Sequence, residues 1–273
     1  MSRNIDNMKK NIILFLFITT FLYQSKSQSI TDSICYKSAV FLEHARDFFS
    51  APLHYGKDEY SDLFKSASLT GLSFFADKKI KSFIRDGRHR TGFMDKVSKI
   101  DRYYGNTKSA VYIIGGTFFT SLIANDKDIL EAGILLAESV IFSNIITQSI
   151  KILSGRERPD KTDNNFHFIG PSLGFDQFHA LPSGHATTSF AISTVAAGLT
   201  DNKYLKVLFY APAFLTSFSR IYNNRHWFSD VMLGSLIGYY TGRKVLSLNG
   251  KIKETEIINI HVGYNSIGLT INF

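Results

Sequence analysis

Long uncharged stretches alternate with short polar segments over the second half of this 273-residue chain. Five stretches carry few or no charges and are too long for typical strands, so each is predicted to be a helix. They cover residues 109–125, 129–153, 186–200, 207–219 and 231–242. The short polar connections at 126–128 and 201–203 imply that the helices they join are antiparallel. The pattern therefore predicts a mainly α-helical, antiparallel bundle.

The chain begins with a pattern typical of exported proteins. Arg3, Lys9 and Lys10 precede an apolar run at 12–23, and small polar residues follow it. This order predicts a signal peptide that is cleaved near residue 27. The alternative is an uncleaved anchor, although the run is shorter than the roughly 20 residues that usually span a bilayer. Either interpretation places the rest of the chain in an exported compartment, which we expect to be the periplasm.

Other segments differ from the apolar stretches and suggest a division of the chain. Residues 30–101 mix charged residues with helical periodicity. Near the C-terminus, two segments alternate between apolar and polar residues around Asn265 and Ser266, which predicts a β-hairpin. The predicted parts are a signal peptide (1–27), an N-terminal helical region (28–105), a core bundle (106–250) and a C-terminal hairpin (251–273).

Charge narrows the classes of partner. The net charge of +8 and the pI near 9.4 favour anionic partners. The basic residues do not form one dense block, and no nucleic-acid-reading motif accompanies them, so phosphorylated or lipid partners are preferred to nucleic acid. Cys35 is the single cysteine, which excludes an internal disulfide and a cysteine-based metal cluster.

Three polar segments stand where predicted helices end or begin. They are residues 151–159 (KILSGRERP), 181–185 (LPSGH) and 219–230 (SRIYNNRHWFSD). In an antiparallel arrangement, one helix ends at the first segment, the next begins at the second, and the last two end and begin at the third. We therefore expect all three segments to meet at one end of the bundle. The intervening loop, 155–182, is long enough to form a rim over a site there.

The chemistry of these segments suits a phosphate group. Arg158 and Arg220 can each bind two phosphate oxygens, and Lys151 supplies a compact positive charge. Ser183 and Gly184 stand where a helix begins, so backbone N–H groups there can face an anion. A structural explanation exists for each segment alone, since basic residues at helix C-termini also offset the helix dipole.

Two histidines supply the reactive groups. His226 and Asp230 are four residues apart, so the carboxylate can accept a hydrogen bond from one ring nitrogen and leave the other nucleophilic. His185 then remains as a general acid for the leaving oxygen. Arg225, next to His226, is interpreted as facing solvent, with a second substrate charge such as a diphosphate as the alternative.

The three segments resemble the signature of the type 2 phosphatidic acid phosphatase family, which shares its fold with bacterial acid phosphatases and vanadium haloperoxidases. That signature is K-x6-R-P, P-S-G-H and S-R-x5-H-x3-D, and it matches here without a gap. The resemblance implies that His226 forms a phosphohistidine, that Asp230 orients it and that His185 protonates the leaving group. It also implies that the phosphate is held by Lys151, Arg158, Ser183, Gly184 and Arg220, with no metal and no cofactor.

The resemblance leaves several functions to compare. The leading one is a phosphatase for lipid phosphate or diphosphate esters that is membrane-associated and has its active site on the periplasmic side. A soluble periplasmic acid phosphatase of broad specificity, acting on small phosphate esters, is the alternative. A vanadate-dependent haloperoxidase is more remote, and a membrane scaffold with an inactive site is weakest.

Overall fold

The computed structural model describes residues 40–86, 91–174, 176–250, and the strands at 258–263 and 266–271. The chain divides into two compact units, Met1–Val40 and Phe41–Phe273. The second unit contains all three polar segments and is the one described below. The predicted signal peptide, 1–27, lies outside the described residues.

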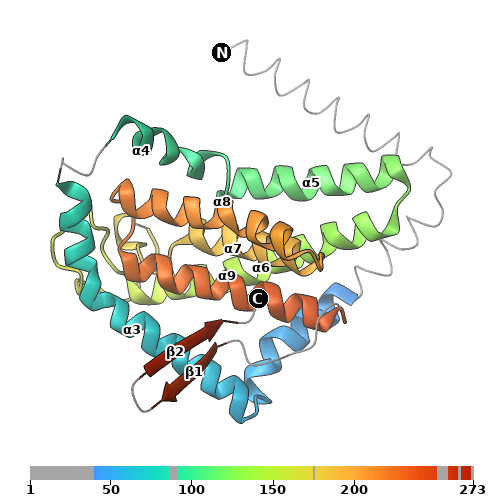
Figure 1. The fold of residues 1–273 in the computed structure, drawn as a ribbon, viewed down its shortest axis with the longest axis horizontal. Helices are drawn as coiled ribbons and strands as arrows, with labels where there is room; N and C mark the ends of the chain where they lie inside the picture. The colour runs from blue at the N-terminus through green and yellow to red at the C-terminus, as the bar shows by residue number, and fades with distance from the viewer. Residues whose placement is uncertain (1–39, 87–90, 175, 251–257, 264–265, 272–273) are drawn as a thin grey trace. The chain divides into compact units, whose positions relative to one another are not determined.

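The described part of the chain is mainly helical, as predicted (Figure 1). A helix at residues 40–50 leads into the short 3-10 turn η1 (Ala51–Leu53), and two further 3-10 turns, η3 (Ile100–Arg102) and η4 (Asp176–Phe178), lie in connections. The longer elements are α3 (Lys57–Arg85), α4 (Gly92–Val97), α5 (Thr107–Ala124), α6 (Lys127–Ser154), α7 (Gly184–Gly198), α8 (Lys203–Tyr222) and α9 (Phe228–Leu248).

Polar caps explain why most helices begin before the apolar stretches. Asn106 Oδ1 accepts a hydrogen bond from Ser109 N at the start of α5, and Asn202 Oδ1 accepts from Tyr204 N at the start of α8. These side chains satisfy amides that have no partner within the helix. Since α8 begins at Lys203, Pro212 lies in the helix interior.

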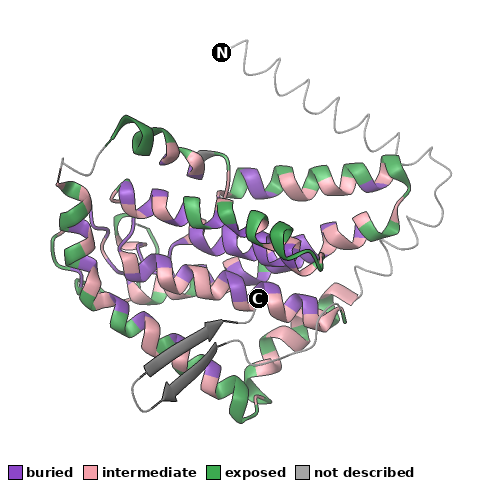
Figure 2. Ribbon diagram, in the orientation of Figure 1, coloured by how far each residue is buried: buried purple, intermediate pink, exposed green. Residues whose placement is uncertain are grey.

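Helix α7 is the centre of the bundle and packs against α6, α8 and α9 (Figure 2). Most of its residues are buried, including small polar ones such as Ser189 and Ser193. One apolar cluster joins Leu135 and Phe142 of α6 to residues of α7 and α9. Figure 1 shows that α6 ends, α7 begins, α8 ends and α9 begins on the same side of the bundle. The predicted convergence of helix ends is therefore found.

Glycines bring the backbones of α7 and α9 into contact. A Cβ atom placed on Gly234 would lie 2.5 Å from the Ser183 carbonyl oxygen, and one on Gly238 would lie 2.2 Å from that of Thr187. Gly242 is similarly close to Thr194. A side chain at the first two positions would force the helices apart, because it would meet backbone atoms.

Helix α3 packs against α9 through a stripe that is polar rather than apolar. Its buried residues recur every three or four positions, which places them on one face. They are Asp62, Ser66, Thr70, Ser73, Asp77 and Lys81. Polar partners meet this face; for example, Ser66 Oγ donates to the Tyr240 hydroxyl at 2.8 Å. The N-terminal helical region is thus joined to the bundle by hydrogen bonds.

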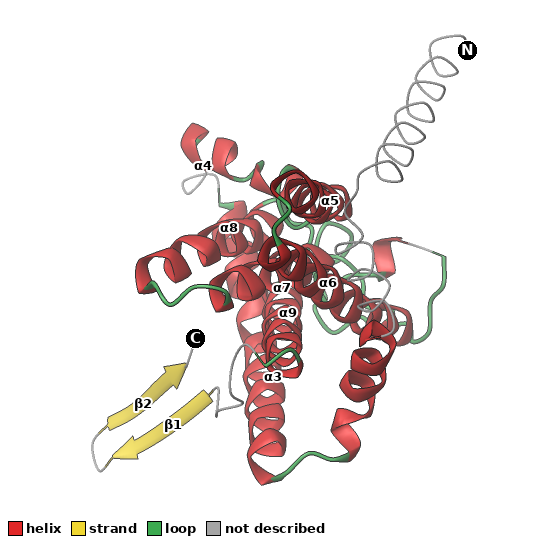
Figure 3. Ribbon diagram, turned by 90° about the vertical axis from the view of Figure 1, so that its right-hand side faces the viewer, coloured by secondary structure: helices red, strands yellow, loops and turns green. Residues whose placement is uncertain are grey.

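Two strands lie in the segment where the sequence alternates (Figure 3). β1 (Ile258–Gly263) pairs antiparallel with β2 (Ser266–Ile271), and the register places Ile258 opposite Ile271.

Candidate active site

His226 lies at the centre of the converged segments and is buried. Its Nδ1 lies 2.7 Å from the Ala180 carbonyl oxygen. Because a carbonyl only accepts hydrogen bonds, Nδ1 carries the proton and Nε2 is left with its lone pair. Nε2 is 3.5 Å from Nη1 of Arg158. The ring therefore offers an unprotonated nitrogen beside a permanent cation.

The charge around His226 is positive. Burial, followed by the positive charges of Lys151, Arg158 and Arg220, holds its pKa well below the ordinary value. Lys151 lies in the last turn of α6 and donates from Nζ to the His179 carbonyl at 2.6 Å. The structure thus brings the three predicted cations to one histidine.

Asp230 has different partners from those expected. Its Oδ2 is 3.6 Å from His226 Nδ1, and the predicted hydrogen bond is replaced by the one to Ala180. Oδ1 instead accepts from Arg156 Nη1 at 2.5 Å, and Oδ2 accepts from Trp227 N at 2.7 Å. Burial raises the pKa of Asp230 to about 6, although the Arg156 charge opposes that rise. Asp230 therefore holds the start of α9 and acts on His226 only through space.

Arg156 is the residue that sequence reasoning missed. Its side chain is completely buried and joins three parts of the chain. Besides Asp230, it donates to Asp77 of α3 at 2.7 Å and to the Asn165 carbonyl of the loop at 2.6 Å. Its guanidinium also lies 4.3 Å from the ring centroid of Phe74. No local pattern marks it, because Asp77 is distant in sequence.

The start of α7 supplies backbone donors. Ser183 is the N-cap: its hydroxyl accepts weakly from Ala186 N at 3.5 Å, and its own N–H donates to the Asp230 carbonyl at 2.9 Å. The first N–H groups of any helix lack partners within that helix and carry partial positive charge. A Cβ on Gly184 would lie 3.8 Å from Lys151 Cε, so these amides stand beside the lysine. This is a setting that favours an anion.

Arg158 and Arg220 each pair with one carboxylate and still have guanidinium donors for a ligand. Arg158 donates to the exposed carboxylate of Asp176 at 2.7 Å, and Arg220 donates from Nη1 to Asp101 at 2.6 Å. The Nε of Arg220 is buried without a hydrogen-bond partner within the described residues. Asp101 was also not foreseen, since it lies outside the three motifs. An orphaned, buried guanidinium donor beside a helix N-terminus fits a phosphate oxygen.

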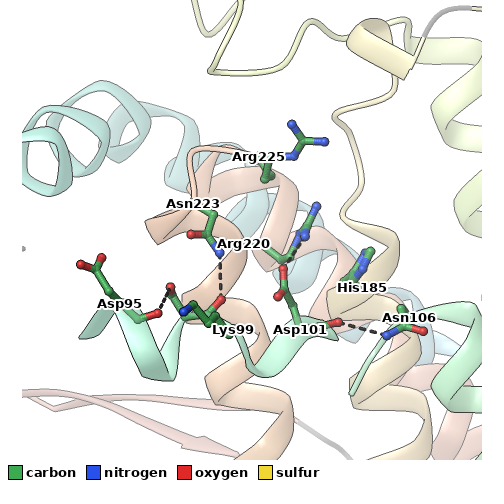
Figure 4. Close-up of a pocket in the computed structure, with 9 residues that line it drawn as sticks. Asp95, Lys99, Asp101, Asn106, His185, Arg220, Asn223 and Arg225 are labelled. Carbon is green, nitrogen blue, oxygen red and sulfur yellow. Dashed lines mark hydrogen bonds and ion pairs between the residues drawn. The ribbon is translucent and has the colours of Figure 1, made fainter. Parts of the chain in front are cut away.

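His185 stands in the first turn of α7 and borders a cavity of about 630 Å³ (Figure 4). Burial, then the charge of Arg220, lowers its pKa to about 4, so the imidazole is neutral near neutral pH. The loop histidines make structural contacts instead. His179 Nε2 pairs with the Ser172 carbonyl at 2.9 Å, and His167 pairs with Glu157 at 2.6 Å. Within the described part of the chain, no group of three His, Cys, Asp or Glu is arranged to hold a metal ion.

Comparisons with known proteins agree with the motifs. Residues 132–253 match the model of the PAP2 superfamily. A lipid A 1-phosphatase of Porphyromonas gingivalis is 37% identical over 90 residues, which are 32% of this chain and 17% of the relative. An undecaprenyl-diphosphatase of Sulfolobus acidocaldarius is 28% identical over 142 residues, which are 50% of this chain and 66% of the relative. The chain thus spans less than two thirds of the length of these relatives.

A solved structure is also similar. It is a PAP2 type phosphatidylglycerolphosphate phosphatase of Bacillus subtilis, with a TM-score of 0.49, 20% identity, and coverage of 72% of this chain and 96% of that one. The motif resemblance is confirmed by the family model, which spans all three polar segments. The matched region, residues 132–253, is therefore similar to the PAP2 superfamily.

Proposed function

We propose that this chain is a metal-independent phosphatase that hydrolyses phosphate mono- or diphosphate esters of a lipid through a phosphohistidine at His226. One observation carries the proposal: a buried, neutral histidine with one unprotonated ring nitrogen lies among Lys151, Arg158 and Arg220. Cations around a nucleophile suit phosphoryl transfer, since charge spreads over three oxygens in its transition state.

The reaction proceeds in two displacements. In the first, Nε2 of His226 attacks phosphorus, the bond from phosphorus to the leaving oxygen breaks, and His185 gives that oxygen a proton. In the second, water attacks phosphorus, the bond from phosphorus to Nε2 of His226 breaks, His185 takes a proton from the water, and inorganic phosphate leaves. The cations and the first amides of α7 hold the equatorial oxygens throughout.

The protonation of His185 is coupled to phosphate binding. Burial and the surrounding cations lower its pKa to about 4, so His185 alone carries no proton to donate near neutral pH. A bound phosphate offsets the positive charges that lower this pKa, and the pKa then rises toward its ordinary value. The proton that His185 donates is therefore either carried in by the substrate or taken up from solvent when the substrate binds.

Exposed apolar side chains favour a lipid substrate. Large apolar residues of α5 and α8 face outward, among them Val111, Tyr112, Phe119, Ile123, Tyr204, Val207, Leu208 and Phe214. Among the described helices, α6 is long and apolar enough to cross a membrane, and 44% of its most apolar window is buried. The relatives carry the names of a lipid A phosphatase and an undecaprenyl-diphosphatase. We place the chain at the periplasmic face of a membrane, with residues 106–250 as the catalytic bundle.

A trapping experiment tests the intermediate. Full-length protein with chelator present is mixed with a lipid phosphate labelled in its phosphoryl group, and the protein is quenched within milliseconds. We expect labelled protein that is stable to base and labile to acid, and no label in His226→Gln. The matched control is His54→Gln, a change at an exposed histidine, which should label like the unchanged protein. Label retained in His226→Gln contradicts the proposed nucleophile.

Substrate class needs a second measurement. Phosphate release is compared between a water-soluble aryl phosphate and a polyprenyl diphosphate in detergent, both with chelator. Strong preference for the lipid supports the proposal. Equal or better turnover of the soluble ester favours the broad-specificity acid phosphatase.

A further inference from the structure

The cavity beside His185 has a wall that lies outside the matched family domain. Its lining comes from residues 95–106, from the start of α7 and from the end of α8 with the turn that follows. The lining residues are Asp95, Ser98, Lys99, Asp101, Asn106, His185, Arg220, Asn223 and Arg225. Figure 4 shows Arg220 between Asn223 and His185, with Arg225 above them.

The wall formed by residues 95–106 is fixed to α7 and α8. The Ser98 carbonyl accepts from Ser219 Oγ at 2.6 Å and from Asn223 Nδ2 at 2.9 Å. Asp95 accepts from the Tyr222 hydroxyl at 2.7 Å. Gly105 has a φ of +83°, and a Cβ there would lie 2.6 Å from the His185 carbonyl oxygen. The cavity is therefore built in advance of any ligand.

The proposed mechanism decides which part of a substrate faces this cavity. In an in-line displacement the nucleophile and the leaving oxygen stand on opposite sides of phosphorus. His185, the proposed acid, lines the cavity, whereas His226 does not. The leaving group must therefore extend into the cavity.

Charge decides what kind of leaving group fits. Of the two carboxylates of the lining, Asp101 forms an ion pair with Arg220, whereas Asp95 accepts a hydrogen bond from the Tyr222 hydroxyl and keeps its negative charge. Arg225 lies 3.5 Å from Asp160 and has a side chain that is 46% exposed. Lys99 is exposed, and no ion pair holds it within the described residues. Two exposed cations, Lys99 without an ion pair in the described structure and Arg225 in a long one with Asp160, thus border a polar space that offers little to a bare alkyl chain.

We propose that this cavity is a leaving-group subsite for a second phosphate, with Lys99 and Arg225 as the residues that select diphosphate over monophosphate esters. The inference rests on the proposed function. His226 attacks the terminal phosphorus, the bond from that phosphorus to the bridging oxygen breaks, and the lipid monophosphate departs with the bonding electrons. Lys99 and Arg225 stabilise the charge that develops there. Arg225, which the sequence was interpreted to place toward solvent, then also binds the second phosphate.

The test compares two substrates with the same chain, farnesyl diphosphate and farnesyl monophosphate, in detergent with chelator. For Lys99→Gln and Arg225→Gln we expect kcat/KM for the diphosphate to fall about tenfold each, since a hydrogen bond to a charged group has about that effect. The loss for the monophosphate should be several-fold smaller. Lys96→Gln, an exposed lysine of α4 that does not line the cavity, is the matched control and should change neither value.

The outcomes separate the inference from the proposed function. Equal losses for both substrates would place the two cations at the reacting phosphate and overturn the subsite. So would unchanged kinetics in both variants. Failure of the unchanged protein to release phosphate from either substrate would instead contradict the proposed function. Inhibition by pyrophosphate gives an independent readout, and we expect it to weaken in both variants more than inhibition by inorganic phosphate.

Discussion

The charged residues on the two sides of His226 differ in burial and in pairing. Behind it, Arg156, Asp77 and Asp230 are completely buried, and each has close partners of opposite charge. In front, Lys99 and Arg225 are exposed, and Arg220 keeps a donor without a partner in the described structure. Arg156 cannot turn to a ligand, because Asp77 and Asp230 would then be left buried and uncompensated. The difference separates charges that hold the site from charges that bind at it.

Removing the buried cation Arg156 should have the largest effect on stability. Arg156→Met leaves Asp77 and Asp230 buried without their cation, so we expect the free energy of unfolding to fall by about 3–5 kcal/mol. Chemical denaturation measures this loss. Arg158→Met is the comparison, two residues away and also largely buried. An equal loss of stability in both variants would remove the distinction between the two sides.

Arg158→Met, which should change stability little, should have a large effect on catalytic activity. Arg158→Met removes a guanidinium next to Nε2 of His226, and we expect kcat/KM to fall about 100-fold or more, equivalent to roughly 3 kcal/mol. Its unfolding midpoint should stay near that of the unchanged protein, because its carboxylate partner Asp176 is exposed and can be solvated. A variant that keeps most of its activity would contradict the role of Arg158 in binding the phosphate.

Acidification should weaken the fold through the histidines. His185 and His226 have folded-state pKa values below the unfolded value of 6.5, so the unfolded chain binds more protons as pH falls below 6.5. The contribution of His185 to stability is then fully present above pH 6.5 and is lost toward pH 4, its folded-state pKa, with a loss of about 2 kcal/mol at pH 5.

His185→Gln should make the dependence of stability on pH less steep between pH 7 and 5, as measured by thermal unfolding. Saturating phosphate should have the same effect in the unchanged protein, since it offsets the cations around His185. Parallel pH profiles for the variant and the unchanged protein would mean that His185 is not held neutral by the fold.

Sequence patterns were informative where function depends on neighbours along the chain. The helices and their ends followed from uncharged stretches, and the convergence of the three motifs followed from antiparallel order. Arg156 and Asp101 were missed because their partners, Asp77 and Arg220, are far away in sequence. The packing face of α3 was missed as well, because it is polar and apolar periodicity does not reveal it. A polar residue every three or four positions was the available signal, starting at Asp62.

The glycine contacts between α7 and α9 hold the two reactive histidines at a constant distance from each other. His185 begins one of these helices, and His226 stands just before the other. With backbone against backbone at Gly234 and Gly238, the separation of the two histidines is insulated from changes at the outer helices. Detergent, lipid or water around α5 and α8 can alter substrate access while the acid and the nucleophile keep their spacing. The proposed enzyme would therefore meet its substrate in different media with the same reactive geometry.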